Sequence, residues 1–360
     1  MTGCLWPCVS SSHATSAGSG GGLFGARGRS PTEVVRHLRD LLRFVADHPE
    51  RCGGKLEGKR SQKVIIDISK GIREMKFILY GNGEGDPVAE ACTQLTTEFF
   101  KDNTLRLVIL CVPFMDLETQ KDVGFVFQNL ARQRVDSRML ASDYLEVNLD
   151  LLDILMAGFD NTDIMIHYSS ILRDCARHQV AARYVLYSQH MKKFFDYIQF
   201  PDFSIASDAF KTFKELLTRH KSSAAEFFTK NYDWFFSEFN FKLVQSSNYV
   251  IKRQSIQLLG DILTERTNSA VLLRYVCSTE NLKVLMNLLR DSSKPIQVEA
   301  FHVFKLFTAN KNKPREIVTI LVANKGKLIR FLDGFTLEKE DRVFESDKAQ
   351  VLDNVIAMKL

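Results

Sequence analysis

FSIASDAFKTFKELL (residues 203–217), YVIKRQSIQLLGDIL (249–263) and KPIQVEAFHVFKLFT (294–308) align without gaps and form a repeat. The three segments begin 46 and then 45 residues apart. They share Ile at the third position, a small residue at the seventh, and large apolar residues at the eighth and eleventh: Ile205, Ile251 and Ile296; Ala209, Ser255 and Ala300; Phe210, Ile256 and Phe301; Phe213, Leu259 and Phe304. Small and large residues at fixed helical positions let neighbouring helices approach closely and interlock.

The repeat extends, in weaker form, toward the N-terminus. Related patterns occur at residues 163–175 and 122–132, and earlier segments such as 34–45 and 61–79 are amphipathic helices by their spacing. Strand signals are sparse. Repeats of about 40 to 47 residues are typical of stacked helical units, which share one core because a single unit cannot bury its own apolar face. We therefore predict an all-α solenoid of about six or seven units.

Composition and cysteine usage fit an intracellular globular protein. The chain has 360 residues, of which 45% are hydrophobic and 25% charged, and a net charge of +5. Its seven cysteines are scattered and odd in number, so we expect reduced thiols and a cytoplasmic location. No apolar run approaches the ~20 residues that span a bilayer, so we expect no membrane insertion.

The N-terminal end differs from the rest of the chain. Residues 1–29 lack acidic residues and are rich in Gly and Ser, so we predict a disordered tail, with a faint similarity to an organellar transit peptide. Gly20, Gly22 and Gly25 match a dinucleotide-binding spacing, but no strand precedes them, so we interpret them as linker. Residues 30–360 are predicted to form a single helical-repeat domain. It begins at a helix that Ser30 and Glu33 would cap.

A second stripe of side chains runs opposite the core stripe. In the three aligned segments, positions one, five and nine lie about 160 to 200° around the helix axis from the core positions. They hold Phe203, Ser207 and Lys211; Tyr249, Arg253 and Gln257; and Lys294, Val298 and His302. The last helix of a repeat usually lines the concave wall of the superhelix. Two interpretations stay open: a binding surface that mixes aromatic and basic residues, or a solvated face whose rings pack against the next repeat.

Sequence motifs for catalysis and for metal binding are lacking. No P-loop, zinc-protease, hydrolase, kinase or EF-hand signature occurs. Cys175 and His178 have metal-like spacing without a second ligand pair, and we expect an ordinary helix-surface pair there. The aromatic residues within 226–239 are expected in the core. We predict a non-enzyme without cofactor or metal.

The quoted segments resemble one family. From about residue 22 onward the chain is similar to the mouse-protein-25 family, also called calcium-binding protein 39. The segments that carry this similarity are SIASDAFKTFKELLTRHK, SNYVIKRQSIQLLGDIL, ENLKVLMNLLRDSSKPIQVEAFHVFKLFTAN and LFGARGRSPTEVV. The resemblance implies an armadillo/HEAT-like right-handed superhelix. It also implies a non-catalytic scaffold that binds and activates protein kinases or pseudokinases, of the Sterile-20-like type in animals and the NDR type in fungi.

The resemblance also implies contact residues. Those of the concave surface are Phe203, Tyr249, Arg253 and Lys283, with Arg266 at the position associated with a third component. A hydrophobic pocket for a Trp-Glu-Phe tail is implied around Met286, with Lys327 as a charge partner. The chain departs from the animal pattern at three further positions associated with these contacts, which are Gln257, Ser269 and Ala323.

The alternative function is a helical-repeat transport or nucleic-acid adaptor that uses the same groove. Against it, acidic residues interrupt the basic ones at Asp208, Asp261 and Glu299. We therefore favour the kinase scaffold and expect no nucleic-acid partner.

Overall fold

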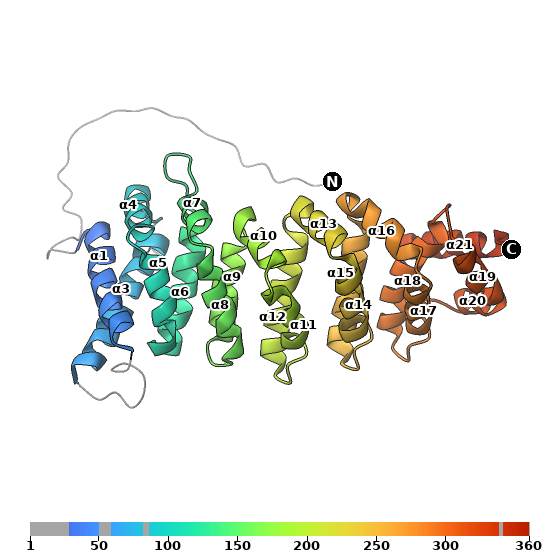
Figure 1. The fold of residues 1–360 in the computed structure, drawn as a ribbon, viewed down its shortest axis with the longest axis horizontal. Helices are drawn as coiled ribbons and strands as arrows, with labels where there is room; N and C mark the ends of the chain where they lie inside the picture. Colours follow the sequence, from blue (N-terminus) through green and yellow to red (C-terminus); the bar gives the residue numbers. More distant parts are fainter. Residues whose placement is uncertain (1–28, 50–58, 82–85, 338–340, 360) are drawn as a thin grey trace.

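The polypeptide is an elongated row of stacked helices (Figure 1). The computed structural model describes residues 29–49, 59–81, 86–337 and 341–359. The predicted tail, apart from Arg29, and the glycine spacing at residues 20–25 lie outside the described residues. Within the described ranges no β-strand occurs, and Val135 and Arg138 form an isolated bridge in a turn. The all-α helical-repeat prediction is confirmed.

One helix from each unit packs directly on its counterpart in the next, from α3 to α21. We call these the ladder helices: α3 (Lys59–Tyr80), α6 (Leu117–Leu130), α9 (Met165–Cys175), α12 (Phe203–Thr218), α15 (Tyr249–Thr264), α18 (Lys294–Ala309) and α21 (Arg342–Ala357). The repeat segments found in the sequence correspond to α12, α15 and α18. We call the exposed side of these helices the ladder face.

Two shorter helices precede each ladder helix from α6 onward. The first of each pair are α4 (Ala89–Phe99), α7 (Leu140–Val147), α10 (Gln179–Tyr187), α13 (Lys221–Lys230), α16 (Ser269–Val276) and α19 (Arg315–Ala323). The second are α5 (Thr104–Cys111), α8 (Asp150–Ala157), α11 (His190–Tyr197), α14 (Tyr232–Glu238), α17 (Thr279–Leu288) and α20 (Lys325–Asp333). Helices α7, α10, α13 and α16 pack in sequence as a second row. Short helical turns η1 (Val112–Phe114), η2 (Gly158–Asp160), η3 (Phe239–Val244) and η4 (Arg266–Asn268) extend some of these helices.

The core positions predicted from the repeat are buried. The seventh-position residues Ala209, Ser255 and Ala300 have no exposed surface, and the Ile, Phe and Leu residues at positions three, eight and eleven are also buried. Helices α12, α15 and α18 pack one against the next along the row. The aromatic residues of 226–239 are likewise buried at Phe227, Phe228, Phe235, Phe236 and Phe239, as expected.

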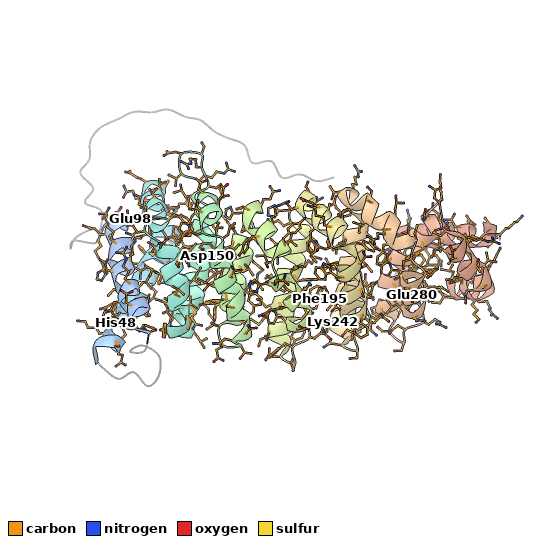
Figure 2. The ribbon with its side chains drawn as sticks, in the orientation of Figure 1. His48, Glu98, Asp150, Phe195, Lys242 and Glu280 are labelled. Atoms are coloured by element: carbon orange, nitrogen blue, oxygen red, sulfur yellow. The ribbon has the colours of Figure 1, made fainter. Side chains whose placement is uncertain are left out.

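Aromatic rings join consecutive units across the middle of the row. Phe195 of α11 packs edge-on against Phe213 of α12 and against Phe235 of α14, with ring centroids 5.4 Å and 5.8 Å apart (Figure 2). At the surface beside this cluster, Lys242 donates to Asp196 of the preceding unit at 2.9 Å. Each unit therefore completes the core of its neighbour.

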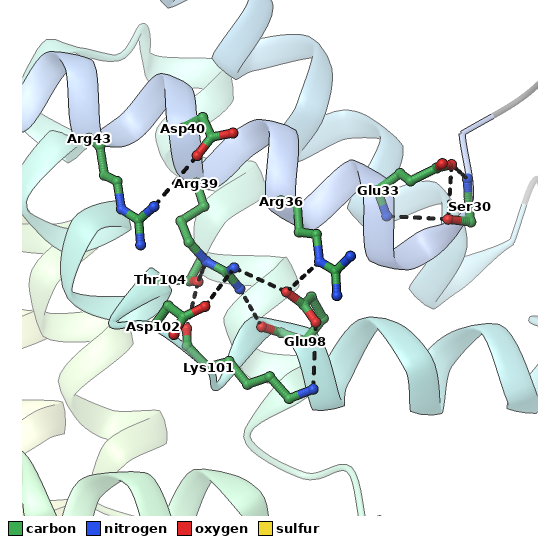
Figure 3. A network of polar contacts seen from close by, with 10 residues as sticks. All are labelled: Ser30, Glu33, Arg36, Arg39, Asp40, Arg43, Glu98, Lys101, Asp102 and Thr104. Carbon is green, nitrogen blue, oxygen red and sulfur yellow. Dashed lines mark hydrogen bonds and ion pairs between the residues drawn. The ribbon is translucent and has the colours of Figure 1, made fainter.

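Helix α1 (Pro31–Asp47) packs on α3, α4 and α5 at the N-terminal end of the row. The predicted capping box is present: Ser30 Oγ accepts from the Glu33 amide, and Glu33 accepts from the Ser30 amide at 2.8 Å (Figure 3). Pro31 occupies the first turn, where a missing amide hydrogen costs nothing.

A buried arginine attaches α1 to the next helices. Arg39 donates to Glu98 Oε1 at 3.0 Å, to the Glu98 carbonyl at 2.7 Å and to Thr104 Oγ1 at 2.7 Å (Figure 3). Arg36 adds a bond to Glu98 at 3.1 Å. Burial raises the pKa of Glu98, but the bonds from Arg36 and Arg39 outweigh it and lower that pKa below its usual value. The carboxylate therefore stays ionised and paired.

Replacing Arg39 by Met is expected to lower the free energy of unfolding by about 3 kcal/mol, because it leaves the buried Glu98 carboxylate short of partners. Urea unfolding followed by circular dichroism measures the change. Arg43→Met on the same helix is the control. Arg43 is half-exposed and 3.6 Å from Asp40, so its loss should cost less than about 0.5 kcal/mol. Equal losses for the two variants would contradict a structural role for the Arg39 network.

Ser255→Ala is expected to raise the free energy of unfolding by about 1 kcal/mol. The Ser255 hydroxyl is buried and has no hydrogen-bond partner among the described residues, so its removal relieves a desolvation cost. The equivalent positions already hold Ala209 and Ala300. The reverse change, Ala209→Ser, serves as the matched control and should destabilise. Urea titrations of both variants check this, and a destabilised Ser255→Ala protein would disprove it.

Candidate functional site

The ladder helices α12 and α15 each begin with an exposed aromatic residue. Asp202 caps α12 by accepting from the Ser204 and Ile205 amides, and Asn248 caps α15 in the same way. The residue that follows each cap is Phe203 or Tyr249, and these side chains are 64% and 44% exposed. Of the two interpretations of this stripe, rings buried against the next repeat are therefore excluded at both positions.

The next turn of α15 is engaged in contacts with α18. Arg253 Nε lies 3.5 Å from Glu299 Oε1, and Gln257 Nε2 donates to the same oxygen at 2.5 Å. The Arg253 side chain is 44% exposed, although its Nε is buried and has no hydrogen-bond partner among the described residues. Glu299 therefore lies at ion-pair distance from Arg253 and leaves much of its side chain exposed.

Ion pairs between successive ladder helices recur along the row. They are Lys76–Asp122 (2.5 Å), Arg173–Asp208 (2.8 Å), Lys214–Asp261 (3.0 Å), Arg253–Glu299 (3.5 Å) and Lys305–Asp347 (2.5 Å). This arrangement reduces the positive charge on the ladder face, because acids of the following unit pair with Lys214 and Lys305. The acids that interrupt the basic pattern in the sequence hold neighbouring units together.

The remaining predicted contact residues lie on other elements. Lys283 is exposed on α17 and pairs with Glu280 at 2.7 Å. Arg266 is exposed in η4, which follows the C-terminal end of α15. Tyr249 lies at the opposite end of that helix, about 25 Å away along the axis at 1.5 Å per residue. The structure thus brings Phe203, Tyr249 and Arg253 onto adjacent ladder helices and places Arg266 at a different edge.

The predicted peptide-pocket residues lie near the C-terminal end of the row. Met286 of α17 is half-buried and packs on the apolar core. Lys327 is exposed on α20, and α19 packs against both α17 and α20. Ala323, the last residue of α19, is exposed as well. These residues occupy neighbouring helices, and the pocket itself stays a prediction.

Sequence reasoning missed an aromatic group on the first ladder helices. The side chains of Phe77 and Phe125 are 57% and 49% exposed, and Tyr80, three residues after Phe77, is also exposed. The Tyr80 hydroxyl donates to the Phe125 carbonyl at 2.8 Å, which joins α3 to α6, and Lys76 lies over the Phe125 ring at 5.0 Å. The signal for these residues was weak because the repeat is faint in this part of the sequence.

Cys175 and His178 are not a helix-surface pair, which corrects that expectation. Both side chains are buried, and burial strongly raises the pKa of the Cys175 thiol. Across the part of the chain with described side chains, no cluster of three or more His, Cys, Asp or Glu residues has a metal-binding arrangement. Among those same residues, every helix is too short or too polar to cross a membrane.

The fold and the ladder face define a helical-repeat protein with exposed aromatic residues on one row of helices. Residues 22–359 match the family described as Mo25-like. An MO25-like protein from Arabidopsis thaliana is 56% identical over 94% of this chain and 98% of its own length. Calcium-binding protein 39-like from Homo sapiens is 38% identical (94% and 97%), and a Mo25-like protein from Schizosaccharomyces pombe is 39% identical (92% and 98%).

The chain therefore belongs to the Mo25-like family. Family membership supports a non-catalytic scaffold role of the Mo25 type.

The ladder ion pairs are expected to contribute to stability in proportion to their burial. Arg173 and Asp208 are each 16% exposed, and Arg173 also donates to Thr212 at 2.8 Å. Lys214 and Asp261 are 48% and 56% exposed. Arg173→Met should lower the free energy of unfolding by about 2 kcal/mol, whereas Lys214→Met should change it by less than about 0.5 kcal/mol. Urea unfolding measures both, and the reverse order would refute this ranking.

Proposed function

We propose that this protein is a cytoplasmic scaffold that binds and activates protein kinases or pseudokinases of the Sterile-20-like or NDR type. The contact surface is the ladder face around Phe203, Tyr249 and Arg253, with Lys283 and Arg266 at its margins. The observation that supports it most is the pair of exposed aromatic residues at the starts of adjacent ladder helices. Exposed aromatic and Arg side chains are the usual anchors of protein interfaces.

Activation needs no catalytic group on the scaffold. A surface that binds the closed, active kinase conformation more tightly than the open one shifts the population toward it by the difference in affinity. The stacked units favour this mechanism, because shared cores and cross-unit ion pairs resist changes in the spacing between Phe203 and Tyr249. A pocket at Met286 would capture a peptide tail of the partner and raise the effective concentration of the main contact. The flexible thioether of Met suits an aromatic anchor.

The charge pattern disfavours the nucleic-acid alternative. Phosphate backbones require unpaired cations, and Lys214, Arg253 and Lys305 on the ladder face each have an acidic neighbour from the next unit. A steep loss of RNA or DNA affinity with rising salt would favour that alternative.

Combining Tyr249→Ala with Arg253→Ala is expected to weaken binding of a recombinant Sterile-20-like or NDR-type kinase by about a thousandfold, since each anchor contributes on the order of 2 kcal/mol. Co-purification and stimulation of kinase activity provide the measurements. Circular dichroism and melting should not change, because neither side chain is part of the core.

The chain offers a closely matched control in Arg183→Ala with Tyr187→Ala. These residues are also four apart on one helix, α10, with the guanidinium 5.2 Å from the ring, and their exposure is similar. They lie off the ladder helices and should be neutral for kinase binding. Met286→Ala tests the second surface separately. Kinase binding that survives the Tyr249 and Arg253 changes would exclude the ladder face as the contact.

A further inference from the structure

Three consecutive ladder helices end in arginine. Arg132 follows α6 and its cap Ala131, Arg177 follows α9 and its cap Ala176, and Arg219 is itself the cap of α12. The pattern stops there, because Glu265 caps α15 and pairs with Lys221 at 2.6 Å. We call Arg132, Arg177 and Arg219 the arginine row.

A histidine links the ends of two of these helices. His220 follows Arg219 in the sequence, and its Nε2 lies 2.8 Å from the carbonyl oxygen of Ala176, the residue before Arg177. The end of α12 is thereby held against the end of α9. Arg132 and Arg219 are both close enough to Arg177 for their charges to lower its pKa, so the three arginines are neighbours in space although they are more than 40 residues apart in sequence.

The arginine row is incompletely neutralised. Arg219 bonds Glu215, and Arg132 lies 3.9 Å from Asp174, which is beyond hydrogen-bond distance. The Arg177 side chain has no hydrogen bond or ion pair among the described residues. Burial, and then the charges of Arg132 and Arg219, lower the pKa of Arg177, and the carboxylates of Asp174 and Glu215 only partly oppose them.

One arginine at each helix end complements the helix dipole. The Arg177 guanidinium has no carboxylate within ion-pair distance among the described residues, and this unpaired group indicates a site for an anion. Guanidinium groups bind phosphate through paired hydrogen bonds, and arginine clusters are the common receptor for phosphorylated peptides.

We propose that the arginine row binds an extended, phosphorylated segment of the protein partner, with phosphoserine or phosphothreonine at Arg177. The choice of a protein phosphate rests on the scaffold function proposed above, since a kinase partner carries such groups. Neighbouring ladder helices are about 9 Å apart, which equals roughly three residues of extended chain. The ligand therefore carries one acidic residue three positions before the phosphorylated residue and another three positions after it. These two acidic residues contact Arg132 and Arg219.

This spacing distinguishes the ligand from other polyanions. Phosphates of one strand of a duplex advance about 3.4 Å along the helix axis per nucleotide, which does not match the ~9 Å spacing of the ladder helices, and some of them would meet the carboxylates of Asp174 and Glu215. Anionic membranes are bound by larger clusters of about four to eight basic residues. A single dianion with flanking carboxylates fits three separated arginines best.

The test is fluorescence anisotropy of the full chain with a synthetic peptide that carries a central phosphoserine and Asp three positions away on each side. We expect the phosphorylated peptide to bind at least about tenfold more tightly than its unphosphorylated form. Arg177→Gln should remove that difference, since a bond to a charged group contributes about tenfold or more. Arg177→Lys should retain part of it. Equal affinity for both peptides, or no effect of Arg177→Gln, would overturn the proposal.

The controls separate the arginine row from general basicity. Arg315→Gln removes an exposed arginine at the start of α19 and should leave peptide binding unchanged. Inorganic phosphate should compete only weakly. Vesicles containing a phosphoinositide should bind no better than neutral vesicles, and preferential binding to them without peptide binding would also refute the proposal. Circular dichroism confirms folding of each variant.

A final comparison separates this inference from the proposed function. The Tyr249 and Arg253 double variant should still bind the phosphopeptide. If a kinase binds through the ladder face while the phosphopeptide does not bind, the arginine-row proposal fails and the scaffold proposal stands. If the peptide binds and no kinase does, the scaffold proposal fails and the arginine row stands as a site for the phosphorylated peptide.

Discussion

Close contact between consecutive ladder helices is the constraint on which the rest of the structure depends. A unit of three short helices cannot bury its apolar surface alone, so its stability comes from its neighbours. Ile251, Ser255 and Leu259 of α15 are buried, whereas Arg253 and Gln257 lie on a different side of that helix and contact Glu299 of the next ladder helix. The buried positions fix the phase of each ladder helix. Once they face the core, the direction of every other side chain on that helix follows.

The surface chemistry is a consequence of this stacking. Side chains at the seam between two units face the preceding or the following helix, and polar residues there find partners across it. Arg173 with Asp208 and Lys305 with Asp347 are examples. Seam contacts thus use up much of the positive charge on the ladder face. Residues at the very start of a ladder helix, such as Phe203 and Tyr249, precede the seam and remain exposed, which leaves them available for a partner.

The core could be predicted from the sequence and the seams could not. Positions three, seven, eight and eleven are fixed by helical phase, which is local information, so Ile251 or Phe304 could be assigned from one segment. The seam partners of Arg253 and Lys214 lie 46 and 47 residues further on, and only the stacking shows which acid each one meets. The aromatic group at Phe77 and Phe125 was missed for a related reason, because its helices match the repeat too poorly to be aligned.

The two ends of the ladder helices present different chemistry, and their separation limits what kind of partner could use both. Aromatic residues begin α12 and α15, whereas arginines end α6, α9 and α12. A ladder helix of 16 residues is about 24 Å long, which an extended chain covers with about seven or eight residues. A folded lobe placed on the aromatic end, with an extended segment leading to the arginine end, satisfies both. The two contacts would then act as one bivalent interaction, in which the rigid helix sets the distance and the first contact raises the effective concentration of the second.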